Sequence, residues 1–373
     1  MKRELVRLTK SFSFLMLIVL FGAGCNPSHQ PEQNRESSSM SDHQLTERNF
    51  VEEEAKLPLE LNEGTFHSVA DWKDSNTIFY ITNEAEGSVV HTYNLFTGES
   101  SLFFEAEAPI VQFEANAEQN LFLVHTSPSS YEAELIILDS KANRTFSTKI
   151  ESYELEYTWD QNNQNQLFIS SFNEDWTFQT YIINVAEKTI TNNQIEMPFI
   201  QWLKNDELSY LKWDQDAPSL TAPLYIYNHE NHEEMLLANN VVENTNFTNE
   251  ISTIELVDED GAASVKFYDL IDKKLLTEMP THLVAQYSDW AIPYHDMNDR
   301  KSIYYMFEGN QDQTAFSLIS FDLETEEKKT IIETIENLPF KLSPNGAFAL
   351  YGARFENLIQ LEDNTIMQLI NLK

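Results

Sequence analysis

From about residue 57 to the C-terminus, the chain is a succession of short segments in which apolar and polar residues alternate, separated by polar turns. Residues 77–81, 121–124 and 135–138 are examples. Alternation with a period of two is typical of β-strands that bury one face. No segment of ten residues has the spacing of an amphipathic helix. The pattern therefore predicts an all-β fold for residues 57–373.

A turn signal recurs through this region at nearly constant spacing. It consists of an apolar residue followed by Asp or Asn, whose side chain can hydrogen-bond the backbone two residues on and start a tight turn. Six such positions lie 41 to 53 residues apart: Asn94, Asp139, Asn184, Asn228, Asp269 and Asp322. Residues 359–364 are a degraded seventh copy.

A second signal precedes the first in each copy: an aromatic residue, a polar turn and an apolar strand. The aromatic positions are Trp72, Phe113, Trp159, Trp202, Phe247, Tyr287 and Phe340. In the first copy the pattern predicts four strands, one ending at Trp72 and the others over 77–82, 88–94 and 101–105. A period of 40–50 residues with four strands per copy indicates a β-propeller, although a β-sandwich or two unrelated β domains are alternatives.

The last copy contains Ser343, Pro344, Asn345 and Gly346 between two apolar strands. This resembles the turn between the two inner strands of TolB-type propeller repeats. We expect six or seven four-stranded blades, because six turn signals favour six while seven aromatic units favour seven. The sixth copy is longer than the others, and residues 296–310 are a candidate for an extra hairpin.

The first 24 residues have the pattern of a signal peptide. Lys2, Arg3, Arg7 and Lys10 precede a short apolar run over 12–21. The run is too short to span a bilayer, which needs ~20 residues. The segment ending at Cys25 resembles the lipobox of bacterial lipoproteins, although Gly22 stands where Leu is usual. The resemblance implies that Cys25 becomes the first residue and carries a diacylglyceryl and palmitate-type anchor. An ordinary secretory peptide cut near Ala23 is the alternative.

These features predict three parts: a lipoprotein signal peptide (1–24), a lipidated Cys25 with a flexible acidic linker (25–56), and a propeller (57–373). The linker is too poor in apolar residues to pack. In combination, they resemble a family of uncharacterised Bacillus-type lipoproteins with a six-bladed β-propeller domain. The resemblance implies anchoring in the cell membrane, on its extracytoplasmic side, and implies no activity.

Charge and cysteine content exclude several classes of function. The formal charge is −36, and removing residues 1–24 makes the chain three charges more negative. A nucleic-acid ligand is excluded because a binder must bring Lys and Arg to phosphates. Docking on anionic lipid headgroups is disfavoured for the same reason. The single cysteine excludes an internal disulfide framework and a Cys-based zinc cluster.

The sequence has no recognisable catalytic motif, and we expect no catalytic residue, metal or cofactor. The nucleophile-elbow, phosphate-loop and dinucleotide patterns are absent. Residues 229–234 contain two His three apart on a predicted turn, which is not the zincin spacing. Residues 258–261 are acidic but lack the distal ligands of an EF-hand. An enzyme would need carboxylates from different blades, as in a glycan-acting hydrolase or lyase.

The loops between the second and third strands of each copy are acidic, and three of them carry aromatics. The candidate binding residues are Tyr131, Trp176, Trp213, Asp175, Asp214 and Asp216. Aromatics are enriched at binding hot spots and carboxylates favour cationic partners. The sequence thus favours a non-catalytic binding or assembly module for an envelope protein, peptide or glycan, with a basic, cationic or sugar-like group as the ligand. Alternatively, the rings fold back on the blades and the acids only maintain solubility.

Overall fold

The computed structural model describes residues 54–371, apart from 62, 117, 161–162, 194, 205–206, 215–218, 229–230, 287–288 and 311–314. Over these residues the chain forms β-strands and no helix. None of them therefore forms a helix with the length and apolar character needed to cross a membrane. The predicted signal peptide, Cys25 and most of the predicted linker lie outside the described residues.

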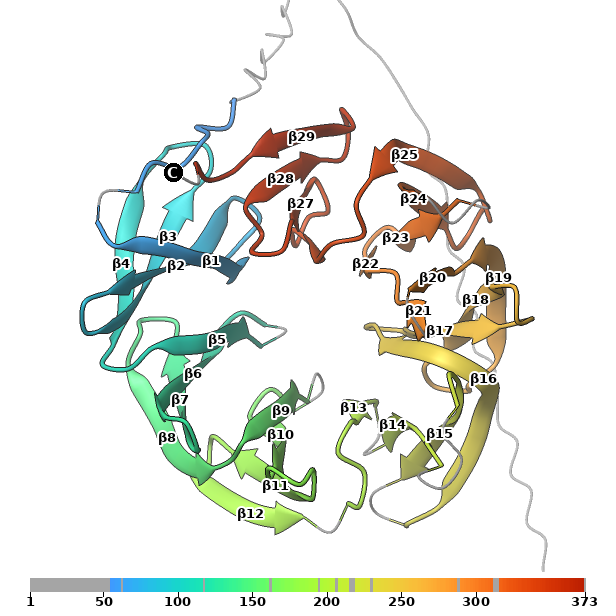
Figure 1. Ribbon diagram of the computed structural model, residues 1–373, viewed down its shortest axis with the longest axis horizontal. Helices are drawn as coiled ribbons and strands as arrows, with labels where there is room; N and C mark the ends of the chain where they lie inside the picture. Colours follow the sequence, from blue (N-terminus) through green and yellow to red (C-terminus); the bar gives the residue numbers. More distant parts are fainter. Residues whose placement is uncertain are drawn as a thin grey trace, which may run out of the picture. The chain divides into compact units, whose positions relative to one another are not determined.

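The strands form consecutive antiparallel sheets arranged as blades around a ring (Figure 1). The first blade comprises β1 (Thr65–Trp72), β2 (Thr77–Glu84), β3 (Gly87–Asn94) and β4 (Ser100–Ala106). The second comprises β5 (Ile110–Ala115), β6 (Leu121–Ser129), β7 (Glu132–Asp139) and β8 (Arg144–Glu151). The third comprises β9 (Glu154–Trp159), β10 (Gln166–Phe172), β11 (Phe178–Asn184) and β12 (Thr189–Asn193).

The fourth and fifth blades share one long strand and so form a single seven-stranded sheet. Its strands are β13 (Gln201–Trp202), β14 (Glu207–Leu211), β15 (Ala222–Asn228), β16 (Glu234–Asn246), β17 (Glu250–Leu256), β18 (Ala262–Asp269) and β19 (Leu275–His282). The first part of β16 is the outer strand of the fourth blade, and its last part, from Val241, is the inner strand of the fifth. Register shifts near Val241 bend the strand between these two roles.

Two further blades complete the ring, after a short hairpin of β20 (Val284–Gln286) and β21 (Asp289–Ala291). The sixth comprises β22 (His295–Asn298), β23 (Ile303–Gly309), β24 (Phe316–Asp322) and β25 (Lys328–Ile335). The seventh comprises β26 (Phe340–Leu342), β27 (Phe348–Tyr351), β28 (Asn357–Gln360) and β29 (Thr365–Gln368). The described residues thus make seven four-stranded blades, which agrees with the aromatic units in the sequence.

The hydrophobic core of the described chain consists of seven clusters, one at each contact between neighbouring blades. Fully buried side chains lie in the clusters, and each contributes roughly 1.5 to 3 kcal/mol of hydrophobic burial. Representative members, in ring order from the contact of blades 1 and 2, are Phe79, Leu167, Phe168, Ile251, Phe267, Phe307 and, at the contact of blades 7 and 1, Trp72.

The ring closes between the first and seventh blades without exchange of strands. Every strand of the first blade comes from the N-terminal side, and every strand of the seventh from the C-terminal side. The closing contact is a core cluster that includes Trp72, Leu369 and Ile370. The backbone adds a parallel bridge between Leu59 and Ile370, in which the Leu59 N–H donates to the Leu369 carbonyl at 2.8 Å. Side-chain packing therefore carries the closure.

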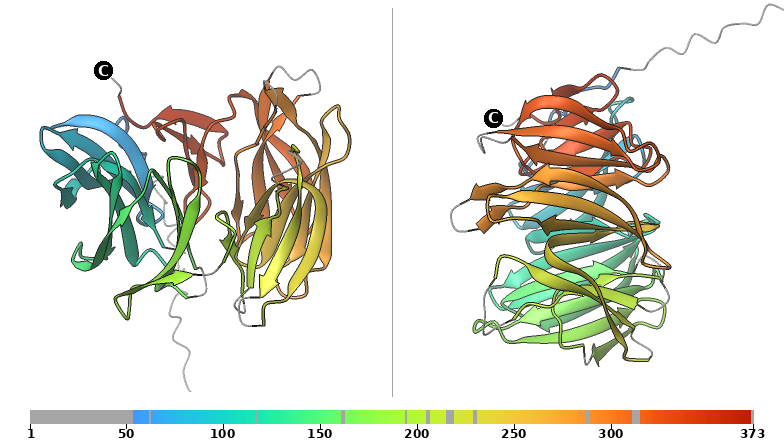
Figure 2. Two further views of the ribbon diagram at one scale, coloured as in Figure 1. Left: turned by 60° about the horizontal axis from the view of Figure 1, so that its bottom comes forward. Right: turned by 90° about the vertical axis from the view of Figure 1, so that its right-hand side faces the viewer.

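Strand order gives the ring two distinct sides (Figure 2). One side holds the loops between the second and third strands of each blade and the connections between blades. The opposite side holds the remaining turns. The described chain begins on this second side, where the Lys56 N–H donates to the carbonyl of Leu95, between β3 and β4, at 2.6 Å.

The prediction for the sixth copy is wrong in one respect. Residues 296–310 form β22 and β23, which are ordinary blade strands, and the extra hairpin is β20 and β21. Tyr287, taken as the aromatic of this copy, lies outside the described residues. The inner strand of the sixth blade carries Met297 instead, which is buried in the same kind of cluster. A thioether fills that gap as well as a ring does.

Replacing Leu369 by Ala tests the closing contact. Leu369 is fully buried, so Leu369→Ala is expected to lower the free energy of unfolding by about 2 to 5 kcal/mol. Ile366→Ala on the neighbouring β29 is the matched control, because Ile366 is 45% exposed and should cost little. Urea unfolding followed by tryptophan fluorescence measures both. Equal effects of the two variants would contradict closure by packing at this contact.

Candidate functional site

Exposed aromatic side chains gather on one side of the ring. Six aromatics of the described residues are largely exposed: Tyr131, Tyr153, Trp176, Phe199, Trp213 and Tyr294. All six lie in loops between second and third strands or in connections between blades. We call this side the aromatic face. Exposed apolar side chains elsewhere, such as Leu275 and Leu276 on β19, are aliphatic. The three aromatics singled out from the sequence therefore share one face with three that were not.

Trp176 lies in a tight turn between β10 and β11. Its backbone has a φ of 64°, a left-handed conformation that is costly for a bulky residue. Asp175 stabilises the turn by accepting hydrogen bonds from the Thr177 backbone N–H at 3.1 Å and hydroxyl at 2.7 Å. These bonds lower the pKa of Asp175. Asp175 thus supports the turn, and the ring of Trp176 is 62% exposed.

A cavity of about 370 Å³ opens between the inner strands of the third, fourth and fifth blades. Two carboxylates from different blades line it, Glu156 of β9 and Glu243 of β16. Phe199 and Trp213 lie at its exposed part, and Tyr157 and Phe168 add two more rings. Polar groups of Thr158, Gln201, Ser209 and Asn244 complete the lining. The cavity therefore combines aromatic and acidic groups, with no Lys, Arg or His among them.

Three of the other exposed aromatics lie near this cavity or beside a second hollow, whereas Tyr294 lines neither of them. Trp176 contacts Phe172 edge-on, with ring centroids 6.0 Å apart, and Phe172 stacks on Phe199 at 5.5 Å. Tyr131 and Tyr153 contact each other at 6.3 Å beside a second hollow of about 300 Å³. Glu156 lines both hollows. The sequence-selected Tyr131, Trp176 and Trp213 thus border one continuous region across the second to fourth blades.

Asp214, one of the predicted acidic residues, is not among the residues that line the cavity. Asp214 is exposed in the loop after β14, and Asp216 lies outside the described residues. The acids that line the cavity, Glu156 and Glu243, were not selected from the sequence. They lie on inner strands rather than in loops, and the one local signal is the alternation of Glu154 and Glu156 before Trp159, which has no counterpart around Glu243.

Burial perturbs the ionisable groups around these hollows. Burial raises the pKa of Glu243 to about 7, with a hydrogen bond from the Asn244 backbone opposing it. Burial also raises the pKa of Glu156, and Glu154 adds to the effect. Burial lowers the pKa of His125, which lines the second hollow, to about 4, so this imidazole is neutral at pH 7. The cavity is thus acidic, and its carboxylates are poorly compensated.

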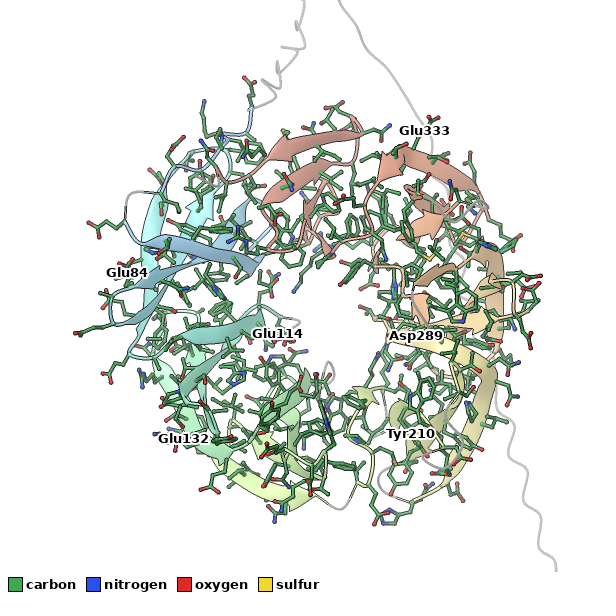
Figure 3. All side chains as sticks on the ribbon, in the orientation of Figure 1. Glu84, Glu114, Glu132, Tyr210, Asp289 and Glu333 are labelled. Carbon is green, nitrogen blue, oxygen red and sulfur yellow. The ribbon has the colours of Figure 1, made fainter. Side chains whose placement is uncertain are left out.

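A second acidic cluster lies on the inner strands near the closing contact. The Lys341 Nζ is 2.8 Å from Asp71 Oδ1, and Asp71 is almost fully buried. Burial opposes the charge on Lys341, but Asp71, Glu114 and Asp296 outweigh it and raise its pKa. Burial raises the pKa of Glu114 to about 7 and that of Asp296 to about 6. Figure 3 shows Glu114 near the ring axis, whereas Glu333 lies at the outer rim.

This second cluster serves the contact between blades. Asp71 Oδ2 accepts from the Ala115 N–H of the next blade at 3.1 Å, and Asp296 Oδ2 accepts from the Leu342 N–H at 2.8 Å. In the fourth blade, Gln201 Oε1 accepts from the Asn246 N–H in the same way at 2.9 Å. In three places, therefore, a side chain of one inner strand accepts a hydrogen bond from the backbone of the next inner strand. We assign this cluster to structure rather than to ligand binding.

In the two motifs considered for metal binding, described side chains form hydrogen bonds or ion pairs with neighbouring residues. His232 Nδ1 lies 2.6 Å from the Tyr227 hydroxyl, and Glu234 pairs with Lys212 at 2.8 Å, whereas His229 and Glu230 lie outside the described residues. Asp258 Oδ1 accepts from the backbone N–H groups of Asp260 and Ala262. Among the described residues, no group of three or more His, Cys, Asp or Glu side chains could hold a metal ion.

The raised pKa of Glu243 predicts a pH-dependent stability. An unfolded Glu has a pKa near ~4.3, so ionising the folded side chain costs free energy between pH ~5 and ~8, and the free energy of unfolding falls across this range. Glu243→Gln resembles the protonated form. We expect it to be more stable than the parent protein by roughly 1 to 3 kcal/mol at pH 8 and nearly equal at pH 5. Urea unfolding at both values measures the difference.

Glu333→Gln, at an exposed position, is the control and should leave stability unchanged at both pH values. Some pH dependence will remain in Glu243→Gln, because Glu114 and Asp296 also have raised pKa values. A Glu243→Gln variant that changes stability equally at pH 5 and pH 8 would contradict the assignment.

Comparisons with known proteins place this geometry in context. Over 366 residues, the chain is 27% identical to "Uncharacterized lipoprotein YqgU" of Bacillus subtilis (strain 168), covering 97% of this chain and 98% of that protein. Among solved structures, it resembles the uncharacterized protein lmo1340 of Listeria monocytogenes EGD-e, with a TM-score of 0.77 and 17% identity over 84% of this chain and 97% of that one. An oligogalacturonate lyase in complex with manganese matches with a TM-score of 0.53 and 8% identity, over 78% and 85% of the two chains. At these identities the structural matches show the fold alone.

A family model described as the YqgU-like 6-bladed beta propeller domain matches residues 94–352. The match starts at the end of β3 and ends just after β27, so it includes parts of the first and seventh blades and the five blades between them. The family description counts six blades, and the described residues of this chain form seven. On this match, which covers more than half of its length, the chain belongs to the YqgU-like β-propeller family.

Proposed function

We propose that this chain is an extracytoplasmic lipoprotein, held in the cell membrane through Cys25, whose propeller is a non-catalytic binding or assembly module. The lipobox-like segment and the relative named as a lipoprotein, which aligns with almost the whole chain, support the anchor. The partner is an envelope protein, peptide or glycan, and it binds on the aromatic face.

The position of the first described residues supports the use of that face. Lys56 lies beside Leu95, on the side of the ring opposite to the aromatic face. The described chain therefore begins on the side away from the exposed aromatics, which supports the aromatic face as the side that partners meet.

The observation that carries the proposal is the gathering of all six largely exposed aromatics of the described chain on one face. Aromatics exposed in polar loops have no part in a core, and they are enriched at the centres of binding interfaces. A contiguous exposed apolar surface marks an interaction site more often than chance placement does.

An enzyme acting on glycans is the second candidate, because the cavity brings Glu156 and Glu243 from two blades to one place. Such chemistry requires one carboxyl group that is protonated and one that is ionised. Burial raises the pKa of Glu243 to about 7, and it also raises that of Glu156, which is the more exposed of the two and has the smaller shift. The enzyme ranks second to the binding module because such chemistry gives no role to the exposed rings outside the cavity, such as Tyr131 and Trp176.

Crosslinking in intact cells tests the proposal. A C-terminally tagged protein is crosslinked and purified, and its partners are identified by mass spectrometry. We expect a reproducible partner that is reduced at least about fivefold by Trp176→Ala/Trp213→Ala, because hot-spot residues dominate binding.

Leu275→Ala/Leu276→Ala is the matched control. These two leucines are exposed to a similar extent but lie on β19. The control variant should retain the partner. A partner that survives loss of both tryptophans, or one that is lost only with the leucines, would rule out the aromatic face.

A further inference from the structure

Two neighbouring hollows on the aromatic face share one lining residue, and we call the two together the groove. The larger cavity lies among the third to fifth blades, and the smaller hollow lies between the second and third. Glu156 lines both of them, and it belongs to the inner strand of the blade between them. Volumes of about 370 and 300 Å³ each suit one large side chain or one sugar ring. A ligand with repeating units could therefore occupy both hollows at once.

The groove carries four acidic side chains, and three of them have no basic side chain beside them in the lining. Its acids are Glu132, Glu154, Glu156 and Glu243. Lys149, on β8, pairs with Glu132 at 2.7 Å, at the edge of the smaller hollow. Lys212, beside Trp213 in sequence, is held by Glu234 at 2.8 Å and lies over the ring of Tyr225. Neither lysine lines the two hollows, and His125, which does, is kept neutral by burial. Glu154, Glu156 and Glu243 therefore have no basic side chain in either lining.

Aromatic rings stand beside these acids. Trp213 and Phe199 line the larger cavity with Glu156 and Glu243, and Tyr153 lines the smaller hollow with Glu154. An ammonium or guanidinium group is attracted by the face of an aromatic ring, most strongly by Trp, and by a desolvated carboxylate. A neutral sugar would stack on the rings but would leave the carboxylates uncompensated. The lining thus favours a cation over a neutral glycan.

We propose that this groove binds an extended polypeptide segment rich in lysine or arginine, with one cationic side chain in the cavity between Glu156 and Glu243, against Trp213 and Phe199. This inference rests on the proposed function and specifies its partner. Repeated cationic side chains along an extended backbone match two hollows that share one carboxylate, and the partner's charge complements the strongly acidic chain.

The ionisation of Glu243 gives the proposal a pH signature. Three ionisable side chains lie around Glu243: Glu156 and Tyr157 of β9, and Tyr304 of β23. A fourth, His295 of β22, is hydrogen-bonded to Thr245, two residues from Glu243 in sequence. Burial lowers the pKa of His295 and raises the pKa of both tyrosines, so Glu243 is the group among these that changes charge near neutral pH. A cation binds the ionised form of Glu243. Binding therefore strengthens as pH rises from 6 to 8.

Titration calorimetry with purified protein tests this inference. The first probe is octalysine with only its N-terminus acetylated, so that its side chains keep their charge. The second is the same peptide with every side-chain Nε acetylated, which is called the acetylated form, and the third is a neutral oligomer of N-acetylglucosamine. We expect octalysine to bind about tenfold or more tighter than its acetylated form, to weaken as salt rises, and to strengthen severalfold between pH 6 and pH 8.

Variants separate the groove from the general charge of the protein. Glu156→Gln/Glu243→Gln should weaken octalysine binding about tenfold. The control Glu333→Gln/Glu362→Gln removes the same charge at exposed positions away from the face and should leave affinity within about twofold. Circular dichroism checks that each variant is folded. Because Glu243→Gln is expected to stabilise the protein, unfolding would not explain weaker binding by the variant that carries it.

Three results would overturn the inference: equal binding of the acetylated peptide, equal effects of the two double variants, or preference for the sugar oligomer. The inference and the proposed function can fail separately. A cellular partner that depends on Trp176 and Trp213, together with failure of octalysine to bind, would keep the binding module and reject the cationic segment.

Discussion

The contact that closes the ring, between the first and seventh blades, is the constraint on which the rest of the structure depends. Blades cannot bury their apolar faces alone, so each relies on its two neighbours. Here the first and last blades share no strand, and the ends of the ring meet through packing around Trp72, Leu369 and Ile370. The Asp71–Lys341 pair adds a charge contact at the same place. If this contact opens, the loops of the different blades lose their fixed spacing, and with it the aromatic face.

The inner strands show a balance between stability and binding. Acidic side chains near the closing contact are matched by Lys341 and by backbone N–H groups of the next blade. Glu243 and Glu156, farther round the ring, are raised in pKa and line a cavity without a basic partner. Carboxylates that cost folding free energy when ionised are typical of sites that await a ligand. Both clusters are acidic, but only the one near the closing contact has a lysine to balance its charge. This is why the cavity lined by Glu156 and Glu243, and not the cluster around Lys341, is proposed as a site.

The fold was largely predictable from the sequence, and the site only in part. The four strands predicted for the first copy match β1 to β4 closely, because alternation and Asx turns are local properties. The prediction of an extra hairpin over residues 296–310 was wrong because the length of the sixth copy shows that residues are added but not where, and the added hairpin is β20 and β21. Trp176 and Trp213 were recognised as exposed from their polar loops. Their connection through Phe172 and Phe199, and the meeting of Glu156 with Glu243, depend on ring geometry that joins residues about 90 positions apart.

Site-specific photo-crosslinking in living cells tests the central claim most directly, which is that partners bind on the aromatic face of a closed ring. A photoreactive phenylalanine analogue would replace Phe199 in one strain and Leu276, on the outer strand β19, in another. The account predicts a discrete adduct from position 199 and none from position 276. An adduct from position 276 alone, or equal adducts from both positions, would contradict it.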